Sequence, residues 1–482
     1  MPQISGLPSA TTPLTGAELI PLSQSGVASQ TALSNIAPAG EVHAQWFGCK
    51  FDGVTDDTAN LQAAINSIAS SGGTVVMPTG QALITGTGIT VPALVSLRGQ
   101  SMSKTQLLLN SSTASVTLSS TPYVNHYGYM SDFTVNGNNL ATAGMVIQGR
   151  SILGLNRVYF FGVPGRGLYI NSCIDIECNM LLFQNCGTAT LGQFEIDGVA
   201  VAGNISTTIL LNSIYISTGA TGCQAGLKID RSRGISIVGG AIESCGIPLM
   251  VCSKSEGTYG VNQLTLRNVD MENATDHYIE AGYGWSGATG QGTVNMSVTN
   301  SNGSVSGSPS ILYAVKLKNT DSFTGINNSW SLTASPTSVY WLEGTSNLRT
   351  SLSQHGGSIA YPFVSVNSAT RADAVPYLDW KLLGGASIFF QGASFALNSA
   401  TPSISGDTLV STNSGVATTI TNVTGGIQGQ LMAIYAGDAN TTLKHLNTGA
   451  GQFRLKSGAN TALSVGLTYL FILDSSGTWS QI

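Results

Sequence analysis

The feature that most constrains this chain is an internal repeat between residues 90 and 290. The segment 167–187 aligns without gaps on 226–246, an offset of 59 residues with six identities in 21 positions. The segment 242–253 aligns on 271–282 at an offset of 29, so two coils of about 29 residues make one step of 59. Repeats of about 20 to 50 residues are typical of solenoids. A period of two in the apolar residues indicates that strands, not helices, build this one.

The same alternation predicts which side chains point inward. Phe183, Ile242 and Met271 are aligned and apolar, so we expect them to stack inside the solenoid. Three further apolar residues are expected on the outer surface, where a partner chain would cover them: Phe161, Leu182 and Ile216.

Residues 46–80 predict a helix followed by a strand. Asp56 or Thr55 can cap the helix, and Gly72-Gly73 can end it. Residues 74–77 have the pattern of a short strand. The apolar residues of the helix fall on one face: Leu61, Ala64, Ile65 and Ile68. A helix with one apolar face can cover the open apolar end of a solenoid.

This segment, WFGCKFDGVTDDTANLQAAINSIASSGGTVVMPTG, resembles the entry motif of pectate-lyase-superfamily β-helices found in bacteriophage tailspikes. The shared elements are an aromatic-Gly pair, Asp-Gly-x-x-Asp-Asp-Thr, a helix, Gly-Gly, a strand and Pro-x-Gly. The resemblance implies an all-β protein: a right-handed, single-stranded parallel β-helix with an N-terminal capping helix, covering residues 41–400 with a transition region. It also implies a homotrimer.

The two ends differ from the repeat. Residues 1–40 resemble the virion-attachment leader of phage tail proteins, in which Glu18-Leu19-Ile20-Pro21-Leu22 is the recurrent phrase; a flexible arm is the alternative. The leader implies a phage tail or baseplate protein as a partner. Residues 401–482 contain short strands and frequent turns, which favour an antiparallel β-sandwich. They resemble the C-terminal modules of phage β-helix proteins, so we expect a role in trimerisation or carbohydrate binding.

Composition excludes several classes of function. The net charge is −5 without a basic cluster, so nucleic acid is not an expected partner. No apolar run approaches the roughly 20 residues of a membrane helix, and the N-terminus lacks signal-peptide features. We therefore expect synthesis in the host cytoplasm without membrane insertion, and the resemblance to tailspikes implies a final place in the virion. The seven cysteines lack metal-ligand spacing, so most are expected to be small buried apolar residues, and neither a metal nor another cofactor is expected.

Three acidic residues form the main catalytic candidate. Glu243 and Glu272 follow aligned inward residues, so they should stack outward on adjacent coils about 4.8 Å apart. Asp270 lies two residues before Glu272 on the same face. Such spacings suit glycoside hydrolysis, with Glu272 as the general acid and Glu243 or Asp270 as base or nucleophile. Alternatively, the acids only stabilise turns at the coil corners.

Other residues are candidates for substrate binding. Asp230, Arg231 and Arg233 occupy a turn before the coil of Glu243, where arginines can bind sugar hydroxyls or a carboxylate; a solvated turn with a local ion pair is the alternative. His277 and Trp285 follow Glu272 and can offer stacking surfaces. A second acidic pair lies elsewhere: Glu195 and Asp197.

These residues and resemblances predict a tailspike that binds and depolymerises a bacterial surface polysaccharide, a capsule, exopolysaccharide or O-antigen, most simply by hydrolysis. Two alternatives stay open from the residues: a polysaccharide lyase acting by β-elimination, and a receptor-binding tail fibre without enzymatic activity. Nothing resembles a phosphate loop, a Ser-His-Asp set or a zinc signature.

Overall fold

The structure is a computed structural model that divides into two compact units, Met1–Ala386 and Ser387–Ile482. It describes residues 19–24, 27–32, 40–199, 205–218, 223–251, 260–283, 293–304, 311, 313–320, 323–326, 328–330, 338–343, 348–351, 364–367, 377–379, 393–394, 399–404, 409–426 and 431–482.

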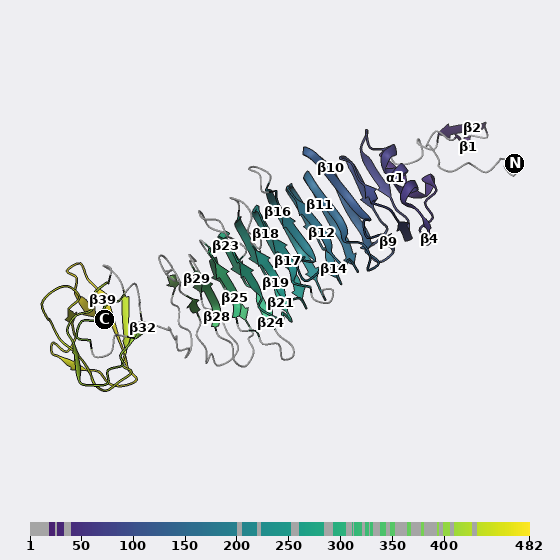
Figure 1. The fold of residues 1–482 in the computed structure, drawn as a ribbon. Coiled ribbons are helices and arrows are strands. Elements are labelled where there is room, and N and C mark those ends of the chain that lie inside the picture. Colours follow the sequence, from purple (N-terminus) through teal and green to yellow (C-terminus); the bar gives the residue numbers. More distant parts are fainter. Residues whose placement is uncertain are drawn as a thin grey trace. The chain divides into compact units, whose positions relative to one another are not determined.

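The first unit contains a parallel β-solenoid whose strands stack along one axis (Figure 1). The strand pairings divide these strands into three sheets. Each coil contributes one strand, or one part of a bent strand, to each sheet. Sheet 1 contains, in order, β7 (Gly88–Thr90), the starts of β10 (Ser115–Asn136) and β11 (Ala143–Phe161), β12 (Arg166–Asn171), β15 (Phe194–Asp197), β17 (Ala225–Ile229), β19 (Ile247–Val251), β22 (Ile279–Ala281), β25 (Tyr313–Lys318), β28 (Ser338–Glu343) and β30 (Val364–Asn367).

Sheet 2 contains β3 (Glu41–His43), β5 (Gly73–Val76), β8 (Val95–Arg98), the middle parts of β10 and β11, β13 (Ile174–Asn179), the starts of β16 (Ser206–Ile216) and β18 (Ser232–Glu243), β20 (Val261–Arg267), β23 (Thr293–Thr299), β26 (Phe323–Ile326), β29 (Leu348–Ser351) and β31 (Tyr377–Asp379). Sheet 3 contains β4 (Asp52–Asp56), β6 (Gly80–Ile84), β9 (Thr105–Leu109), the ends of β10 and β11, β14 (Leu182–Gln184), the ends of β16 and β18, β21 (Asp270–Glu272), β24 (Asn302–Ser304) and β27 (Ser329–Trp330). The predicted parallel β-helix is therefore confirmed.

Single residues with positive φ make the corners between sheets 2 and 3. Asn268 and Asn300 adopt φ values of 55° and 49°, and Ser213 adopts 51°. One residue in this left-handed conformation turns the chain sharply, and asparagine tolerates it better than most side chains do. The corners explain why strands so short can close a coil of about 29 residues.

The inward residues of sheet 3 form a continuous stack, as predicted. Strand register aligns Phe183 with Ile216, Ile216 with Ile242, and Ile242 with Met271. All four side chains are fully buried, and the ring of Phe183 stacks on that of Phe160 with centroids 4.9 Å apart. The expectation that Ile216 points outward was wrong, because the left-handed corner at Ser213 places Ile216 in the inward column.

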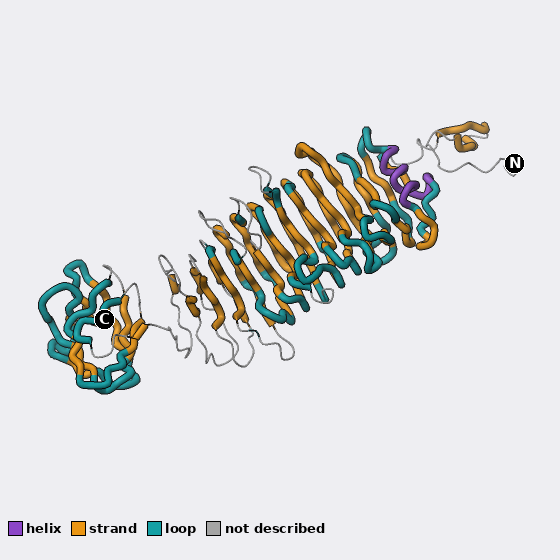
Figure 2. The backbone as a smooth tube through the Cα atoms, in the orientation of Figure 1, coloured by secondary structure: helices purple, strands orange, loops and turns teal. Residues whose placement is uncertain are grey.

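The expected capping helix is α1 (Thr58–Ser67), which lies at the N-terminal end of the solenoid beside a short 3-10 helix, residues Ala44–Phe47 (Figure 2). Leu61, Ala64 and Ile65 are buried in the core as expected. The cap position is Asp57 rather than Asp56 or Thr55. The carboxylate of Asp57 accepts hydrogen bonds from two backbone N–H groups of the preceding loop, at 2.7 and 2.8 Å, and so joins that loop to the helix. Asp56 accepts a hydrogen bond of 2.9 Å from the backbone N–H of Thr58, the first helical residue.

Gly73 begins the strand after the helix and cannot carry a side chain. Its φ is 142°, and a Cβ there would lie 2.2 Å from the carbonyl oxygen of Gly40. The Gly-Gly pair therefore does more than end the helix, because it lets β5 pair closely with β3.

Outside the solenoid, β1 (Leu19–Gln24) and β2 (Val27–Ala32) pair as an antiparallel hairpin. In the second unit one sheet contains β32 (Ala393–Ser394), β33 (Leu409–Ser411), β35 (Leu431–Tyr435), β39 (Thr468–Leu473), β40 (Trp479–Gln481) and β37 (Phe453–Arg454), and the other contains β34 (Thr418–Ile420), β36 (Thr441–Leu443) and β38 (Thr461–Ala462). The two sheets fit the expected β-sandwich, but each mixes parallel and antiparallel pairs. Trp479 is fully buried in its core, and the indole N–H donates to the backbone oxygen of Val423 at 3.0 Å.

The described cysteines are unpaired and buried, as expected for small apolar residues: Cys49, Cys173, Cys178, Cys186, Cys223 and Cys245. Burial raises the pKa of the Cys223 thiol to about 11, so this side chain stays protonated near neutral pH. None of the helices in the described part of the chain is long and apolar enough to cross a membrane.

Candidate functional site

The three predicted acidic residues come together on the outer face of sheet 3. Glu243 ends β18 and lies directly opposite Glu272 on β21, while Asp270 lies opposite Ala241. All three carboxylates are half-buried. Adjacent strands are about 4.8 Å apart, and diagonal neighbours such as Glu243 and Asp270 are about 7–8 Å apart.

Three negative charges on the carboxylates of this trio would repel one another. Partial burial, repulsion by Glu272 and repulsion by Asp270 all raise the pKa of Glu243. Within the described residues, no basic side chain forms an ion pair with any of the three carboxylates. Glu243 therefore holds a proton more readily than a glutamate in its ordinary range does.

The corners beside the trio do not need the carboxylates. Ser244 and Asn273, which follow the two glutamates, have φ values of 51° and 53°. Their backbone N–H groups donate to the backbone oxygens of Glu272 and Ser304, each at 2.9 Å. Backbone hydrogen bonds thus continue the coil through these corners, which weakens the alternative that the acids serve only as turn residues.

A hollow of about 550 Å³ opens on the same face of sheet 3, nearer the N-terminus. Tyr159, Phe161 and Leu182 line it together with Lys104 and Gln106. The hydroxyl of Tyr159 donates to the side-chain oxygen of Gln184 at 2.5 Å. Leu182 belongs to β14, and only the end of β16 separates this strand from β18 with Glu243. The hollow and the acids therefore share one surface.

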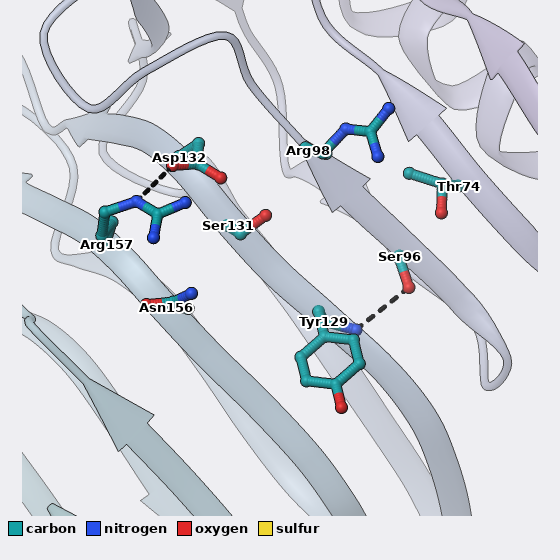
Figure 3. A pocket seen from close by; sticks show the side chains of 8 residues that line it. All are labelled: Thr74, Ser96, Arg98, Tyr129, Ser131, Asp132, Asn156 and Arg157. Carbon is teal, nitrogen blue, oxygen red and sulfur yellow. Dashed lines mark hydrogen bonds and ion pairs between the residues drawn. The ribbon is translucent and has the colours of Figure 1, made fainter. Parts of the chain in front are cut away.

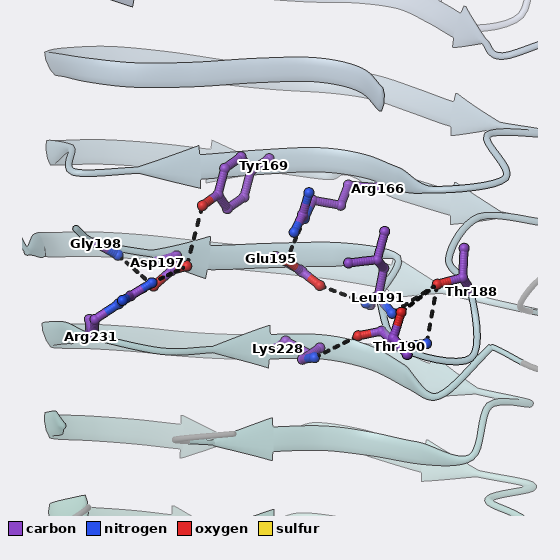
Figure 4. A network of polar contacts seen from close by, with 11 residues as sticks. Arg166, Tyr169, Thr188, Thr190, Leu191, Glu195, Asp197, Gly198, Lys228 and Arg231 are labelled. Atoms are coloured by element: carbon purple, nitrogen blue, oxygen red, sulfur yellow. Dashed lines mark hydrogen bonds and ion pairs between the residues drawn. The ribbon is translucent and has the colours of Figure 1, made fainter. Parts of the chain in front are cut away.

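A second polar cluster occupies the outer side of sheet 1, where Glu195 and Asp197 are neutralised (Figure 4). Arg166 donates to Glu195 at 2.5 Å, and Arg231 donates two hydrogen bonds of 2.9 Å to the carboxylate of Asp197. Tyr169 also donates to Asp197, at 3.2 Å. Glu195 and Asp197 are 2% and 1% exposed, so these pairs connect coils beneath the surface. Their charges are satisfied within the chain, whereas the trio has no ion-pair partner among the residues that the structure describes.

The predicted binding residues are scattered. Arg231 uses its guanidinium to bind Asp197, and the neighbouring Asp230 is buried. Arg233 is exposed, and its Nε lies 3.4 Å from the side-chain oxygen of Gln263. Trp285 lies outside the described residues. The structure therefore does not bring Asp230, Arg231 or Arg233 together with the trio.

His277 is fully buried and has acidic neighbours. Its Nδ1 lies 3.0 Å from Asp276 and its Nε2 lies 3.3 Å from Glu280, ion-pair distances without hydrogen-bond alignment. Burial lowers the pKa of His277, but the contacts with Asp276 and Glu280 outweigh it, so the net change is upward. Its place in the fold favours a structural role over contact with a polysaccharide.

The aromatic lining of the hollow was only partly anticipated from the sequence. Phe161 was expected to point outward, and Tyr159 has the same parity in the phrase Val158-Tyr159-Phe160-Phe161. That alternation around the buried Phe160 was the signal that could have identified the hollow. In the described part of the chain, no group of three or more His, Cys, Asp or Glu side chains is arranged to hold a metal ion.

Comparison with known proteins adds a family and a fold. Residues 42–307 match the family described as rhamnogalacturonase A/epimerase, pectate lyase-like. The tailspike protein of E. coli bacteriophage HK620, solved as a mutant in complex with a hexasaccharide, is similar over 89% of this chain and 84% of that one, with a TM-score of 0.54 and 12% identity. The enzymatically active domain of bacteriophage CBA120 tailspike protein 2 is similar over 73% of this chain and 54% of that one, with a TM-score of 0.52 and 12% identity. At this identity the likeness shows a shared fold. No curated protein matches the sequence.

Proposed function

Because the chain belongs to the pectate lyase-like family of rhamnogalacturonase A and epimerases, we propose that it is a phage tailspike that binds and cleaves a bacterial surface polysaccharide. The observation that carries the proposal is the trio of half-buried carboxylates, Glu243, Asp270 and Glu272, on one outer face without basic partners among the described residues. Three such groups cost stability through mutual repulsion, and a need for acid–base chemistry explains their presence. The similarity to tailspike folds supports the same assignment.

The trio supports a general acid–base mechanism of glycoside hydrolysis. In this proposal Glu243 is the general acid, rather than Glu272 as expected from the sequence, because partial burial and its two acidic neighbours raise its pKa and favour its protonated form. Glu243 donates its proton to the leaving glycosidic oxygen, and Asp270 removes a proton from the attacking water. Their diagonal separation of about 7–8 Å leaves room for that water, as in inverting hydrolases. Glu272 then keeps Glu243 protonated.

The hollow beside the trio supplies the binding surface in this proposal. Tyr159 and Phe161 present aromatic rings with centroids 5.9 Å apart, and sugar rings can pack their apolar faces on such rings. Three strand spacings, about 14 Å, separate the end of β11 with the two rings from β18 with Glu243. A single polysaccharide strand can therefore contact the aromatic rings and the acids at once.

One experiment tests the proposed reaction. The full chain is incubated with a panel of purified capsules, exopolysaccharides and O-antigens, and the products are analysed by mass spectrometry. Products that have gained water support hydrolysis, whereas a new double bond identifies the lyase alternative. Cleavage by a Glu243→Gln, Glu272→Gln double variant at the wild-type rate would remove the trio from the mechanism, and binding without cleavage by the wild type would identify a receptor-binding fibre.

We also propose that the chain works as a homotrimer attached to the tail through its N-terminal segment. The resemblance of residues 1–40 to virion-attachment leaders and of residues 401–482 to the C-terminal modules of phage β-helix proteins supports this proposal. Light scattering should give a mass about three times 49.7 kDa. A mass of one chain at micromolar concentration would contradict the trimer.

A further inference from the structure

A second hollow lies on sheet 2 (Figure 3). The acids lie on sheet 3, which is a different face of the solenoid. The second hollow's volume of about 220 Å³ is less than half of the roughly 550 Å³ of the hollow on sheet 3, which suits one sugar ring better than a long oligosaccharide. Side chains from β5, β8, β10 and β11 line it: Thr74, Ser96, Arg98, Tyr129, Ser131, Asp132, Asn156 and Arg157. Four neighbouring coils thus contribute to one small polar site.

Tyr129 is the aromatic member of this hollow and is unusually open to solvent. Its side chain is 63% exposed. A Cβ on Gly154, opposite it on β11, would lie 2.4 Å from the Tyr129 ring, so the ring lies directly against the glycine. The backbone N–H of Tyr129 donates to the hydroxyl of Ser96 at 3.0 Å, which fixes the strand on which the ring stands. The result is a supported ring with an uncovered face.

Two arginine–carboxylate pairs complete the site. Arg98 lies 2.8 Å from Glu41, and Arg157 lies 2.6 Å from Asp132. About half of each arginine side chain is exposed, 45% and 48%. Each guanidinium has five N–H donors and makes one hydrogen bond within the described chain, so donors remain for a ligand. The two positive and two negative charges balance.

We propose that this hollow is a second carbohydrate site, which binds one uncharged sugar residue and takes no part in cleavage. The sugar ring packs its apolar face on Tyr129, and adjacent hydroxyl groups bind the arginine–carboxylate pairs, which offer donors and acceptors side by side. Balanced charge argues against an acidic sugar as the preferred ligand. That the ligand is a saccharide rests on the proposed function, whereas the position of the site rests on its own residues.

The test separates this site from the trio. The full chain with Glu243→Gln and Glu272→Gln, which binds but does not consume substrate, is the parent. Binding to an array of purified bacterial surface polysaccharides is compared for the parent and for the parent with Tyr129→Ala or Tyr127→Ala. Tyr127 is the matched control, since it is 60% exposed on the same strand and does not line the hollow. Ser131→Leu, which fills the hollow and leaves Tyr129 in place, is a second test variant.

We expect Tyr129→Ala and Ser131→Leu to weaken binding about tenfold, and Tyr127→Ala to leave it unchanged. Raising the salt from about 50 to 500 mM should change the affinity of the site less than about twofold, because the charges balance. Equal binding by the Tyr129 and Tyr127 variants would overturn the second site even if the trio cleaves. A parent that binds no polysaccharide would contradict both proposals. Cleavage by the wild-type chain, together with unchanged binding when Tyr129→Ala is added to the parent, would contradict only this one.

Discussion

Glu243 and Glu272 lie directly opposite each other on adjacent parallel strands, as the last residues of β18 and β21. Their inward neighbours, Ile242 and Met271, pack together in the core, so the backbone cannot move the two carboxylates apart without disturbing that packing. Partial burial and this enforced proximity raise the pKa of Glu243. A proton held at this position is the simplest way to relieve the repulsion.

The first prediction concerns catalysis. Glu243→Gln keeps the shape and hydrogen bonding of the side chain but removes its acid, so cleavage should fall by about 10²- to 10⁴-fold while binding is retained. Reducing-end assays on the cleaved polysaccharide measure the loss. Glu177→Gln is the matched control, because Glu177 is an exposed glutamate of β13 on sheet 2. A Glu243→Gln variant within a few-fold of wild type would show that the residue is not the acid.

The second prediction is a pH dependence of stability. The pKa of Glu243 is higher in the folded chain than in the unfolded one, so protonation of this residue stabilises the folded state. This contribution to stability is complete at pH values below the ordinary pKa of glutamate, about 4.3. That contribution is lost as the pH rises through the raised pKa. Glutamine does not ionise, so the Tm of Glu243→Gln should exceed that of wild type at neutral pH, and the difference should shrink toward pH 4. Scanning calorimetry across this range checks it; a constant difference would exclude the titration of Glu243 as its cause.

The third prediction separates a structural arginine from an exposed one. Arg231→Gln leaves the buried carboxylate of Asp197 without its charge partner, so unfolding free energy should fall by about 3–5 kcal/mol. Arg233→Gln, two residues away and exposed, should change it by less than about 0.5 kcal/mol. Urea denaturation measures both. If Arg231→Gln instead weakened polysaccharide binding without loss of stability, the residue would belong to a binding site, as the sequence suggested.

The fourth prediction tests the alternation of side chains. Phe183→Ala opens a cavity in the aromatic stack beside Phe160 and should cost about 3–5 kcal/mol. Leu182→Ala, one residue earlier on the outer face, should cost well under about 1 kcal/mol. Chemical denaturation of the two variants compares the two faces of β14 directly. Similar losses for both would mean that the outer face of β14 is covered in solution, and Leu182 would then belong to an interface between chains and not to the hollow.

The sequence predicted the solenoid well because its evidence is local and repeated. Alternating apolar residues and the offset of 59 place Phe183 and Ile242 in one column, and strand register confirms this. The offset of 29 holds at Met271 but slips afterwards, because Leu249 pairs with Ile279 and not with the gap-free match Tyr278. One extra residue at a corner is enough to cause the slip.

The polar sites were harder to predict, since they depend on contacts between coils. Arg231 and Asp197 are 34 residues apart, and only the register of neighbouring coils brings them together. Nothing in the sequence around Arg231 distinguishes a buried ion pair from a sugar-binding arginine. The trio was accessible to prediction because its members occupy equivalent positions on strands whose alignment was already known.

The stacking of coils in sheet 3 also fixes the distance between the aromatic hollow and the acids. Each coil adds one strand and about 4.8 Å between the aromatic hollow and the acids, a step comparable to one sugar unit. Inserting one whole coil of about 29 residues between β16 and β18 would leave corners and core intact but move the two features one step apart. Under the proposed function, the number of coils between the hollow and the acids sets the length of the released oligosaccharide. Duplication of a coil can therefore change that length without changing any side chain that contacts the substrate.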